Sequence, residues 1–409
     1  MRDRSPRVIA VLAVALAAAL AGCGKSAIRP HKGGGPTAAV APLAAQGAVS
    51  VVTKNTTRLG GAEAASDAAA VARAVYPGLT AATRPEAVVI VDRRNWGAAL
   101  AASALASAPL RAPLLYSDGA TLPEVSRDAL EAMRPTGAPA LGGAQVILLG
   151  TSAAPPSGYR ARSLAVRSAE PAGAAVVARL LASVQGSRAR RVILVASDAQ
   201  RALQMPAAGL AAESGAPILF TASTGVPAAT SAALSHLRRP AIYLVGVPAI
   251  SRAALGELAR FGQVTPIAQA GAVGAGPTPV ENAIAVARFT DGVFGWGIKE
   301  PGHGLVFANA SRPLDAPAAA PLSATGEYGP LLLLEDPAAV PQALASYLSN
   351  IQPAYGRAPQ YQPVHGAYNH GWLIGDETAI SPATQAELDA SLEIVPARGA
   401  AEENGASPE

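Results

Sequence analysis

The chain has 409 residues, of which 50% are hydrophobic and 15% charged, and its formal net charge is +4 at pH 7. A chain this long and apolar can bury two or three cores, and its low charge excludes a disordered protein or a nucleic-acid-binding tail. Because Cys23 is the single cysteine, no intramolecular disulfide can form.

The first 22 residues are typical of a secretory signal peptide. Arg2, Arg4 and Arg7 precede an apolar run at 8–21, which is too short to cross a bilayer comfortably. The run ends in Leu20-Ala21-Gly22-Cys23, which resembles the bacterial lipobox. The resemblance implies cleavage before Cys23, lipid attachment to that cysteine, and anchoring on the outer face of the cell membrane. The alternative is an ordinary secretory signal with an incidental cysteine.

Two flanking segments lack the pattern of folded structure. Residues 23–47 contain three consecutive glycines and no sustained apolar period, so they predict a flexible tether. Residues 397–409 are small, acidic and poor in apolar side chains, so they predict a frayed tail.

Between these flanks, one strand–helix–strand pattern occurs three times. Apolar runs begin at Val88, Val192 and Leu305, and each leads through an Ala-rich segment to a proline followed by a second apolar run. The proline lies 25 residues after the first apolar residue in every copy, at positions 113, 217 and 330. We interpret this as one α/β unit used three times.

The first unit is predicted to have strands at 48–53, 88–91, 114–116 and 146–150, with helices at 62–75, 98–108 and 123–133. The second is predicted to have strands at 164–166, 192–195, 218–221 and 242–246, with helices at 172–184, 202–213 and 227–238. The third is predicted to have strands at 265–267, 305–308, 331–334 and 372–375, with helices at 279–290, 314–324 and 337–350. This alternation predicts parallel βαβ units with right-handed crossovers.

The pattern resembles the cell-wall-binding repeat 2 family over roughly residues 50–396. Arg58-Leu59-Gly60-Gly61 is similar to the opening motif of a family module, and Pro313-Leu314-Asp315-Ala316 is similar to its helix start. The three Pro-Leu-Leu-type strands are similar to a third motif. The Arg-Tyr-Glu-Thr that follows the family opening is absent from every unit, and the helix-start Asp occurs only in the third.

The resemblance implies three open Rossmann-like modules, at 48–161, 162–265 and 266–396, packed as a pseudo-threefold trimer within one monomeric chain. It also implies non-covalent binding of an anionic wall polymer, either a polysaccharide or a teichoic-acid-like chain. No cofactor and no catalytic activity are implied.

In open parallel sheets, ligands bind beyond the carboxyl ends of the strands, where helix N-termini favour anions. The loops at these ends carry an Arg with amide or hydroxyl groups, and the family motifs add two further positions. The predicted ligand-binding residues are Arg58, Arg93, Arg94, Asn95, Ser197, Arg201, Asn309, Ser311, Arg312 and Asp315. The alternative is that these residues are helix caps and solvated turn charges.

Other local patterns point to no catalytic chemistry. The sequence lacks the Gly-x-Ser-x-Gly, P-loop and His-Glu-x-x-His motifs, and the glycines at 271–276 lack dinucleotide-binding spacing. An insertion at 355–372 contains aromatics that can stack on sugars, or it is loop filler. Its His365 and His370 fit no common metal site.

The sequence thus predicts a non-catalytic, lipid-anchored envelope protein whose three modules bind a wall polymer through several weak sites together. Two alternatives stay open: a solute-binding lipoprotein of a transport system, and a structural envelope protein with a degenerate polymer site.

Overall fold

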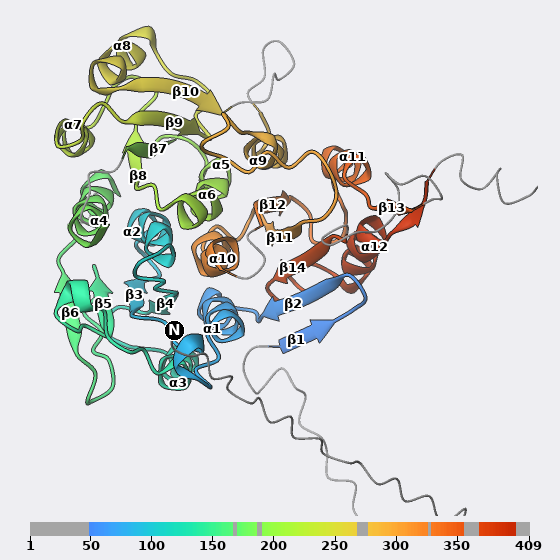
Figure 1. Ribbon diagram of the computed structural model, residues 1–409, viewed down its shortest axis with the longest axis horizontal. Helices are drawn as coiled ribbons and strands as arrows, with labels where there is room; N and C mark the ends of the chain where they lie inside the picture. The colour runs from blue at the N-terminus through green and yellow to red at the C-terminus, as the bar shows by residue number, and fades with distance from the viewer. Residues whose placement is uncertain are drawn as a thin grey trace, which may run out of the picture. The chain divides into compact units, whose positions relative to one another are not determined.

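Three open sheets of mostly parallel strands, flanked by helices, carry the fold (Figure 1). The computed structural model describes residues 49–166, 170–185, 190–267, 277–325, 329–355 and 368–397. The predicted signal peptide, Cys23, the tether and the tail after Ala397 lie outside these ranges, as does the glycine-rich segment at 271–276. Across the described ranges, no helix combines the length and the apolar character needed to cross a membrane.

The first sheet has the strand order β4-β3-β5-β6, and all of its strands are parallel. Its strands are β3 (Val88–Asp92), β4 (Leu114–Ser117), β5 (Val146–Leu149) and β6 (Ala161–Leu164). The helices of this part of the chain are α1 (Ala64–Val75), α2 (Trp96–Ala102) and α3 (Glu124–Met133). Strands β4 and β5 are buried throughout, as expected for strands that helices cover on both faces.

The second sheet repeats this arrangement in the order β10-β9-β7-β8, again with parallel strands. Its strands are β7 (Arg191–Ala196), β8 (Ile218–Thr221), β9 (Ala241–Val245) and β10 (Gln263–Ile267). The accompanying helices are α4 (Glu170–Gln185), α5 (Arg201–Gln204), α6 (Pro206–Ser214), α7 (Ala228–Ser235) and α8 (Arg252–Phe261).

The third sheet has the order β1-β2-β14-β11-β12, in which only β1 is antiparallel to its neighbour. Its strands are β1 (Val49–Val52), β2 (Thr56–Gly60), β11 (Gly304–Asn309), β12 (Leu331–Leu334) and β14 (His370–Ile374). The helices are α9 (Pro279–Arg288), α10 (Asp315–Ala324), α11 (Gln342–Asn350) and α12 (Pro382–Leu392). A small pair, β13 (Ala354–Tyr355) with β15 (Val395–Pro396), lies apart from it.

Each unit gives its opening strand to the sheet of a neighbouring unit. Strand β6, which opens the predicted second unit, pairs with β5, and β10, which opens the third, pairs with β9. Strand β2, which follows the tether, pairs with β14 of the third unit. The opening strand of each unit therefore belongs to the sheet of another unit, and the first and last units share a sheet. The module boundaries themselves stay predictions.

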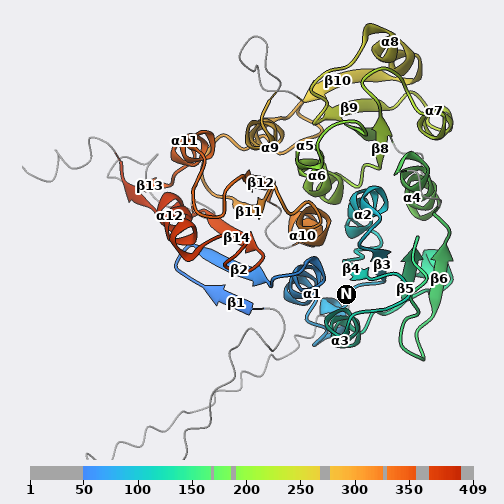
Figure 2. The same ribbon diagram turned by 180° about the vertical axis from the view of Figure 1, so that it is seen from behind.

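Helices from all three units meet at the centre of the fold. Helix α10 packs against both α1 and α6, as the two opposite views show (Figure 1, Figure 2). Ala106, Ala212 and Ala320, one from each unit, form a small buried cluster there. Alanine side chains allow these helices to approach one another closely. The pseudo-threefold symmetry itself stays a prediction.

Three helical regions differ from the sequence prediction. The helix predicted at 202–213 is divided into α5 and α6, and Pro206, which has no N–H to donate, begins the second part. Helices α8 and α12 were not predicted, although both begin with cap signals. The hydroxyls of Ser251 and Ser381 each accept a backbone hydrogen bond at the N-cap.

Candidate functional site

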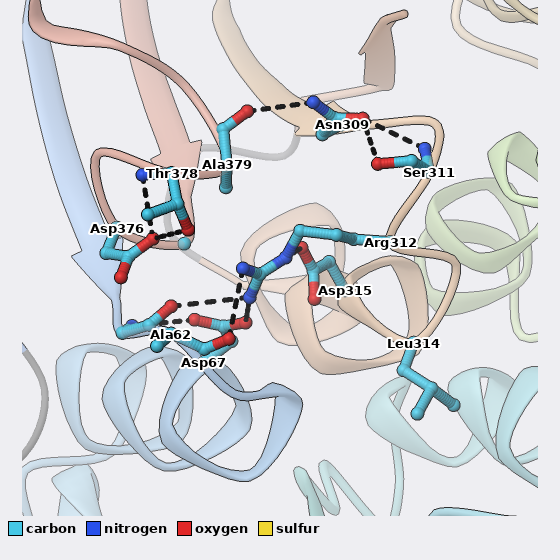
Figure 3. A network of polar contacts seen from close by, with 12 residues as sticks. Ala62, Asp67, Asn309, Ser311, Arg312, Leu314, Asp315, Asp376, Thr378 and Ala379 are labelled. Carbon is cyan, nitrogen blue, oxygen red and sulfur yellow. Dashed lines mark hydrogen bonds and ion pairs between the residues drawn. The ribbon is translucent and has the colours of Figure 1, made fainter. Parts of the chain in front are cut away.

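The third strand-end loop is closed by the protein's own side chains (Figure 3). Arg312 follows β11, and its Nε donates a hydrogen bond to Asp315 at 2.8 Å. Its Nη2 donates to Asp67 of α1, a residue 245 positions earlier in the chain. Both carboxylates are at most 1% exposed. The guanidinium therefore ties the third unit to the first and is not available to an external anion.

Two buried carboxyl groups thus share a single guanidinium. Burial, and then the negative charge of Asp67, raise the pKa of Asp315 well above its usual range. Burial also raises the pKa of Asp67, but Arg312 and the backbone N–H of Gly61 oppose that effect. Of the two carboxyl groups, Asp315 therefore holds a proton to higher pH, and Asp67 is the one whose charged form Arg312 favours.

The remaining polar groups of this loop are also satisfied internally (Figure 3). The Asn309 side chain donates to the carbonyl of Ala379 at 2.9 Å and accepts hydrogen bonds from the backbone N–H and hydroxyl of Ser311. Asn309 is 2% exposed. These contacts fix the loop to the turn after β14, so Asn309 and Ser311 serve as a turn and not as an open ligand site.

Arg58, which was predicted to contact ligand, is buried and hydrogen-bonded within the fold. It lies on β2 and is 2% exposed. Its Nε and Nη2 donate to Gln385 Oε1, and the guanidinium also donates to the carbonyls of Gly375, Asp376 and Ile380. Burial lowers the pKa of Arg58, and the carboxylates of Glu377 and Asp376 oppose the change. The family-type opening motif therefore joins β2 to the end of β14.

The second strand-end loop sends one residue toward the first unit. Ser197 donates its hydroxyl hydrogen to the carbonyl of Thr221 at 3.1 Å, so it fixes the loop. Arg201 begins α5, and its Cζ lies 5.9 Å from the ring centroid of Trp96 in α2. Among the described residues, Arg201 has no carboxylate within ion-pair distance.

The first strand-end loop presents its arginines to solvent. Arg94, whose side chain is 66% exposed, donates from Nε and Nη2 to the two oxygens of Asp92, both at 3.0 Å. Arg93 forms exposed ion pairs with Asp118 and Glu63. Asn95 is the N-cap of α2 and accepts a hydrogen bond from the N–H of Ala98, as the capping alternative requires.

Arg94, Asn95 and Arg201 converge on one polar cavity of about 440 Å³. It is lined by Asp92, Arg94, Asn95, Trp96, Gly150, Val166, Glu170 and Arg201. The cavity lies where β3 and β5 end side by side, and the chain continues from these two strands in opposite directions. This is the topological switch point, at which open parallel sheets bind ligands.

The cavity is lined by two arginines and two acidic residues, but among the described residues only Arg94 forms an ion pair there, with Asp92. Burial would raise the pKa of Asp92, but the hydrogen bonds from Arg94 lower it below its usual range. Burial raises the pKa of Glu170, and the charge of Arg201 opposes this effect. Arg94 is therefore oriented by a full anion, whereas Arg201 faces a carboxyl group that holds its proton to higher pH.

Small residues leave space between the first and second units, whereas polar side chains extend across the other two junctions between units. Asp67, Gly173 and Asn282 are each the fourth residue of a helix, α1, α4 and α9. Asp67 binds Arg312, and Asn282 donates to the carbonyl of Leu203 at 2.8 Å, but Gly173 has no side chain to extend across its junction. Gly97 is needed as well, because a Cβ there would lie 2.6 Å from that of Glu170.

Formal charge is distributed unevenly among the three predicted modules. Residues 162–265 contain 11 basic and 4 acidic residues, whereas 266–396 contain 4 basic and 12 acidic residues. Residues 48–161 are nearly balanced, with 10 basic and 8 acidic residues. The polar cavity lies at the junction of the first module with the strongly basic one.

Sequence reasoning missed Trp96 and Glu170, which line the cavity, and Gln204, which holds Trp96 in place. Trp96 Nε1 donates to Gln204 Oε1 at 2.6 Å, and Gln204 Nε2 donates to the carbonyl of Ala196 at 2.7 Å. The apolar neighbours of Trp96 and Gln204 in sequence suggested ordinary core helices. A buried amide in such a helix was the available signal, because buried polar groups need partners.

The insertion at 355–372 is described only in part, and Arg357, Tyr361 and His365 lie outside the described ranges. His370 lies 3.0 Å from the hydroxyl of Thr57 through Nε2 and packs edge-on against Trp372. Within the part of the chain that the structure covers, no three His, Cys, Asp or Glu residues are grouped as a metal site requires.

Comparison with known proteins reveals similarity in fold. No protein-family model matches the chain, and no curated protein matches its sequence. The solved structure of Cwp6 from Clostridium difficile has a TM-score of 0.61 and 16% identity, over 85% of this chain and 51% of that one. Cwp8 from Clostridium difficile has a TM-score of 0.60 and 16% identity, over 83% and 52%. The chain thus spans about half the length of these two proteins.

Proposed function

We propose that this protein is a non-catalytic component of the cell envelope that binds an anionic cell-wall polymer, a polysaccharide or a teichoic-acid-like chain. Three features support the proposal: the family-like repeat pattern, the fold shared with Cwp6 and Cwp8, and the polar cavity between the first two units. The likeness to these two proteins fits a cell-wall-associated role outside the cytoplasm.

The convergence of Arg94 and Arg201 on the cavity is the observation that carries the proposal. A guanidinium reads phosphate or carboxylate groups through paired hydrogen bonds. Arg94 is already held by Asp92 in a fixed orientation, and Arg201 has no ion-pair partner among the described residues. An anionic repeat of the polymer would pair with Arg201, and the positive field of residues 162–265 would attract the rest of the polymer.

The closed third loop changes the expected number of sites. Three equal strand-end sites would give avidity, but Arg312 and Asp315 are committed to Asp67 and to each other. Arg201 of the second loop lies at the cavity of the first. We therefore propose one principal site, built by the first two units together.

Retention on purified cell wall tests this proposal. The wild-type protein should be retained before acid extraction of anionic polymer and lost after it. The Arg94→Ala/Arg201→Ala variant should lose at least about tenfold of its affinity, since each charge-assisted hydrogen bond contributes about 1.5–3 kcal/mol. The control is Arg73→Ala/Arg127→Ala, which removes two exposed arginines on α1 and α3, outside the cavity. Equal retention on extracted wall, or equal loss in both variants, would contradict a polymer site at the cavity.

We also propose that Cys23 carries lipid, such as palmitate, and anchors the protein to the membrane. The lipobox-like Leu20-Ala21-Gly22-Cys23 supports this, because two or more acyl chains anchor a protein stably. Intact mass and labelled palmitate incorporation should both change in Cys23→Ser, and that variant should be released from membranes. Unchanged mass would contradict the anchor.

A further inference from the structure

Two of the three sheets hold a tyrosine ring between the helices that cover their edge strand. In the first unit, Tyr76 is 4% exposed and packs with Leu115, Leu130 and Met133. In the third unit, Tyr347 is 1% exposed, and its hydroxyl donates to the carbonyl of Ile298 at 3.2 Å. The guanidinium of Arg288 lies 4.9 Å above the Tyr347 ring.

The second unit has alanine at both corresponding positions. Tyr76 lies 12 residues after the first residue of α1, and the same count from the start of α4 reaches Ala182. Tyr347 lies six residues after the N-cap Pro341 of α11, and six residues after the N-cap Pro227 of α7 is Ala233. The second unit therefore lacks a ring where each of the others has one.

A cavity of about 430 Å³ lies at this place in the second unit. Its lining is largely apolar and consists of Ala178, Arg179, Ala182, Pro217, Leu219, Ala233, His236 and Leu237. Arg179 has the same position in α4 as Arg288 has in α9, nine residues after the first. The cavity therefore has room for an aromatic ring next to the Arg179 guanidinium. In the third unit, the corresponding space is occupied by Tyr347 beneath Arg288.

The third module has the opposite formal charge and two exposed tyrosine rings. The third module, with its 12 acidic and 4 basic residues, presents Tyr355 at 46% exposure and Tyr368 at 60%. The cavity lies in the basic module, and the exposed Arg238 and Arg239 directly follow its Leu237 wall. Charge complementarity of this kind steers association and fixes its orientation.

We propose that the cavity of the second unit receives a tyrosine side chain, Tyr355 or Tyr368, from the acidic third unit of a second copy of the chain. Aromatic side chains bury large apolar areas and anchor interfaces at small entropic cost. The contact joins two different surfaces, so it is head-to-tail and can propagate along a row of copies. The cavity shares no residue with the polymer site, and the inference goes beyond the proposed function.

Sedimentation velocity of the purified full chain tests this inference. The weight-average sedimentation coefficient should rise with protein concentration at low salt and fall back at high salt, where charges are screened. Ala182→Tyr places the missing ring in the cavity, so it should lower the association constant at least tenfold and raise the midpoint of thermal unfolding. Tyr355→Ala/Tyr368→Ala should also prevent association.

Controls separate the cavity from a general effect of added tyrosine. Ser183→Tyr puts the ring on the exposed side of α4 and should leave association unchanged. Ala233→Tyr, which copies Tyr347, replaces Ala182→Tyr if that variant fails to fold. With wild-type protein, p-cresol should compete with association. A monomer at every concentration, association unaffected by both cavity-filling variants, or p-cresol binding by a protein that stays monomeric would overturn the inference.

Discussion

The indole Nε1 of Trp96 donates a 2.6 Å hydrogen bond to Oε1 of Gln204, and this bond joins the first unit to the second beneath the polar cavity. Trp96 is 2% exposed and Gln204 is 1% exposed. Arg201 lies over the same indole ring, three residues before Gln204. The position of Arg201 in the cavity therefore depends on this buried pair.

Gln204→Leu should destabilise the protein and weaken polymer retention together. The change leaves the Trp96 indole N–H and the Ala196 carbonyl without their side-chain partner, and each unsatisfied buried group costs about 1–3 kcal/mol. Urea unfolding measures the free energy, and wall retention measures the site. Gln200→Leu, an exposed change at the N-cap of α5, should leave both unchanged. Full stability in Gln204→Leu would show that the bond is dispensable.

Arg58→Met should lower the free energy of unfolding without a specific effect on polymer binding. The variant loses every hydrogen bond that the guanidinium makes to Gln385 and the turn after β14. We expect a loss of at least about 3 kcal/mol, because hydrogen bonds to charged groups contribute about 1.5–3 kcal/mol each.

Arg58→Lys should rescue little of this loss, since an ammonium cannot reproduce the guanidinium fork. Lys54→Met, at an exposed ion pair, is the control and should cost less than about 1 kcal/mol. If the folded fraction of Arg58→Met lost polymer binding while its stability was normal, Arg58 would be a ligand contact after all.

Asp315→Asn should flatten the dependence of stability on pH. The folded-state pKa of Asp315 is raised by burial and by Asp67, so the folded protein binds its proton more tightly than the unfolded chain does. This contribution to stability is present at acid pH and is lost as pH rises toward the raised pKa. Asparagine mimics the protonated acid, so the variant should match or exceed wild-type stability at neutral pH in urea titrations.

Asp67→Asn supplies the contrasting variant. It should be destabilising at neutral pH, because Arg312 loses the anion that faces it. Equal destabilisation by both asparagine variants would mean that the proton is not held on Asp315.

Polymer retention should strengthen as pH falls through the raised pKa of Glu170. Protonation removes the negative charge facing Arg201, while Asp92 keeps its charge and continues to orient Arg94. Glu170→Gln should therefore show the acid-pH retention already at neutral pH, with a reduced pH dependence. Salt gradients on immobilised wall measure both effects. Glu124→Gln, an exposed change on α3, should retain the wild-type profile.

Much of the fold could be predicted from local pattern. The equal spacing to Pro113, Pro217 and Pro330 identified two paired strands in each sheet, because the second strand of each pair is a short buried run directly after the proline. The sheet that an opening strand joins could not be predicted, since β2, β6 and β10 carry no local mark of their partner. Helices α8 and α12 could have been predicted from the cap signals at Ser251 and Ser381.

The candidate site could be predicted only in part. The strand-end loops with Arg94 and Arg201 follow from chain order and parallel-sheet topology. Whether such an arginine stays open depends on a residue of a distant helix, as Asp67 does for Arg312 across 245 positions. Such a contact is tertiary. The sequence alone therefore does not show that Gly173 leaves space between two units or that Asp67 closes the space between two others.

The pairing of β2 with β14 also has a consequence for biosynthesis. Thr57 lies opposite Trp372 in this pair, and its hydroxyl lies 3.0 Å from Nε2 of His370, 313 residues later in the chain. During translation, the segment that becomes β2 therefore emerges long before its neighbour exists, and it must stay unpaired without aggregating. Nearly the whole chain must therefore be synthesised before the sheet that pairs β2 with β14 can close.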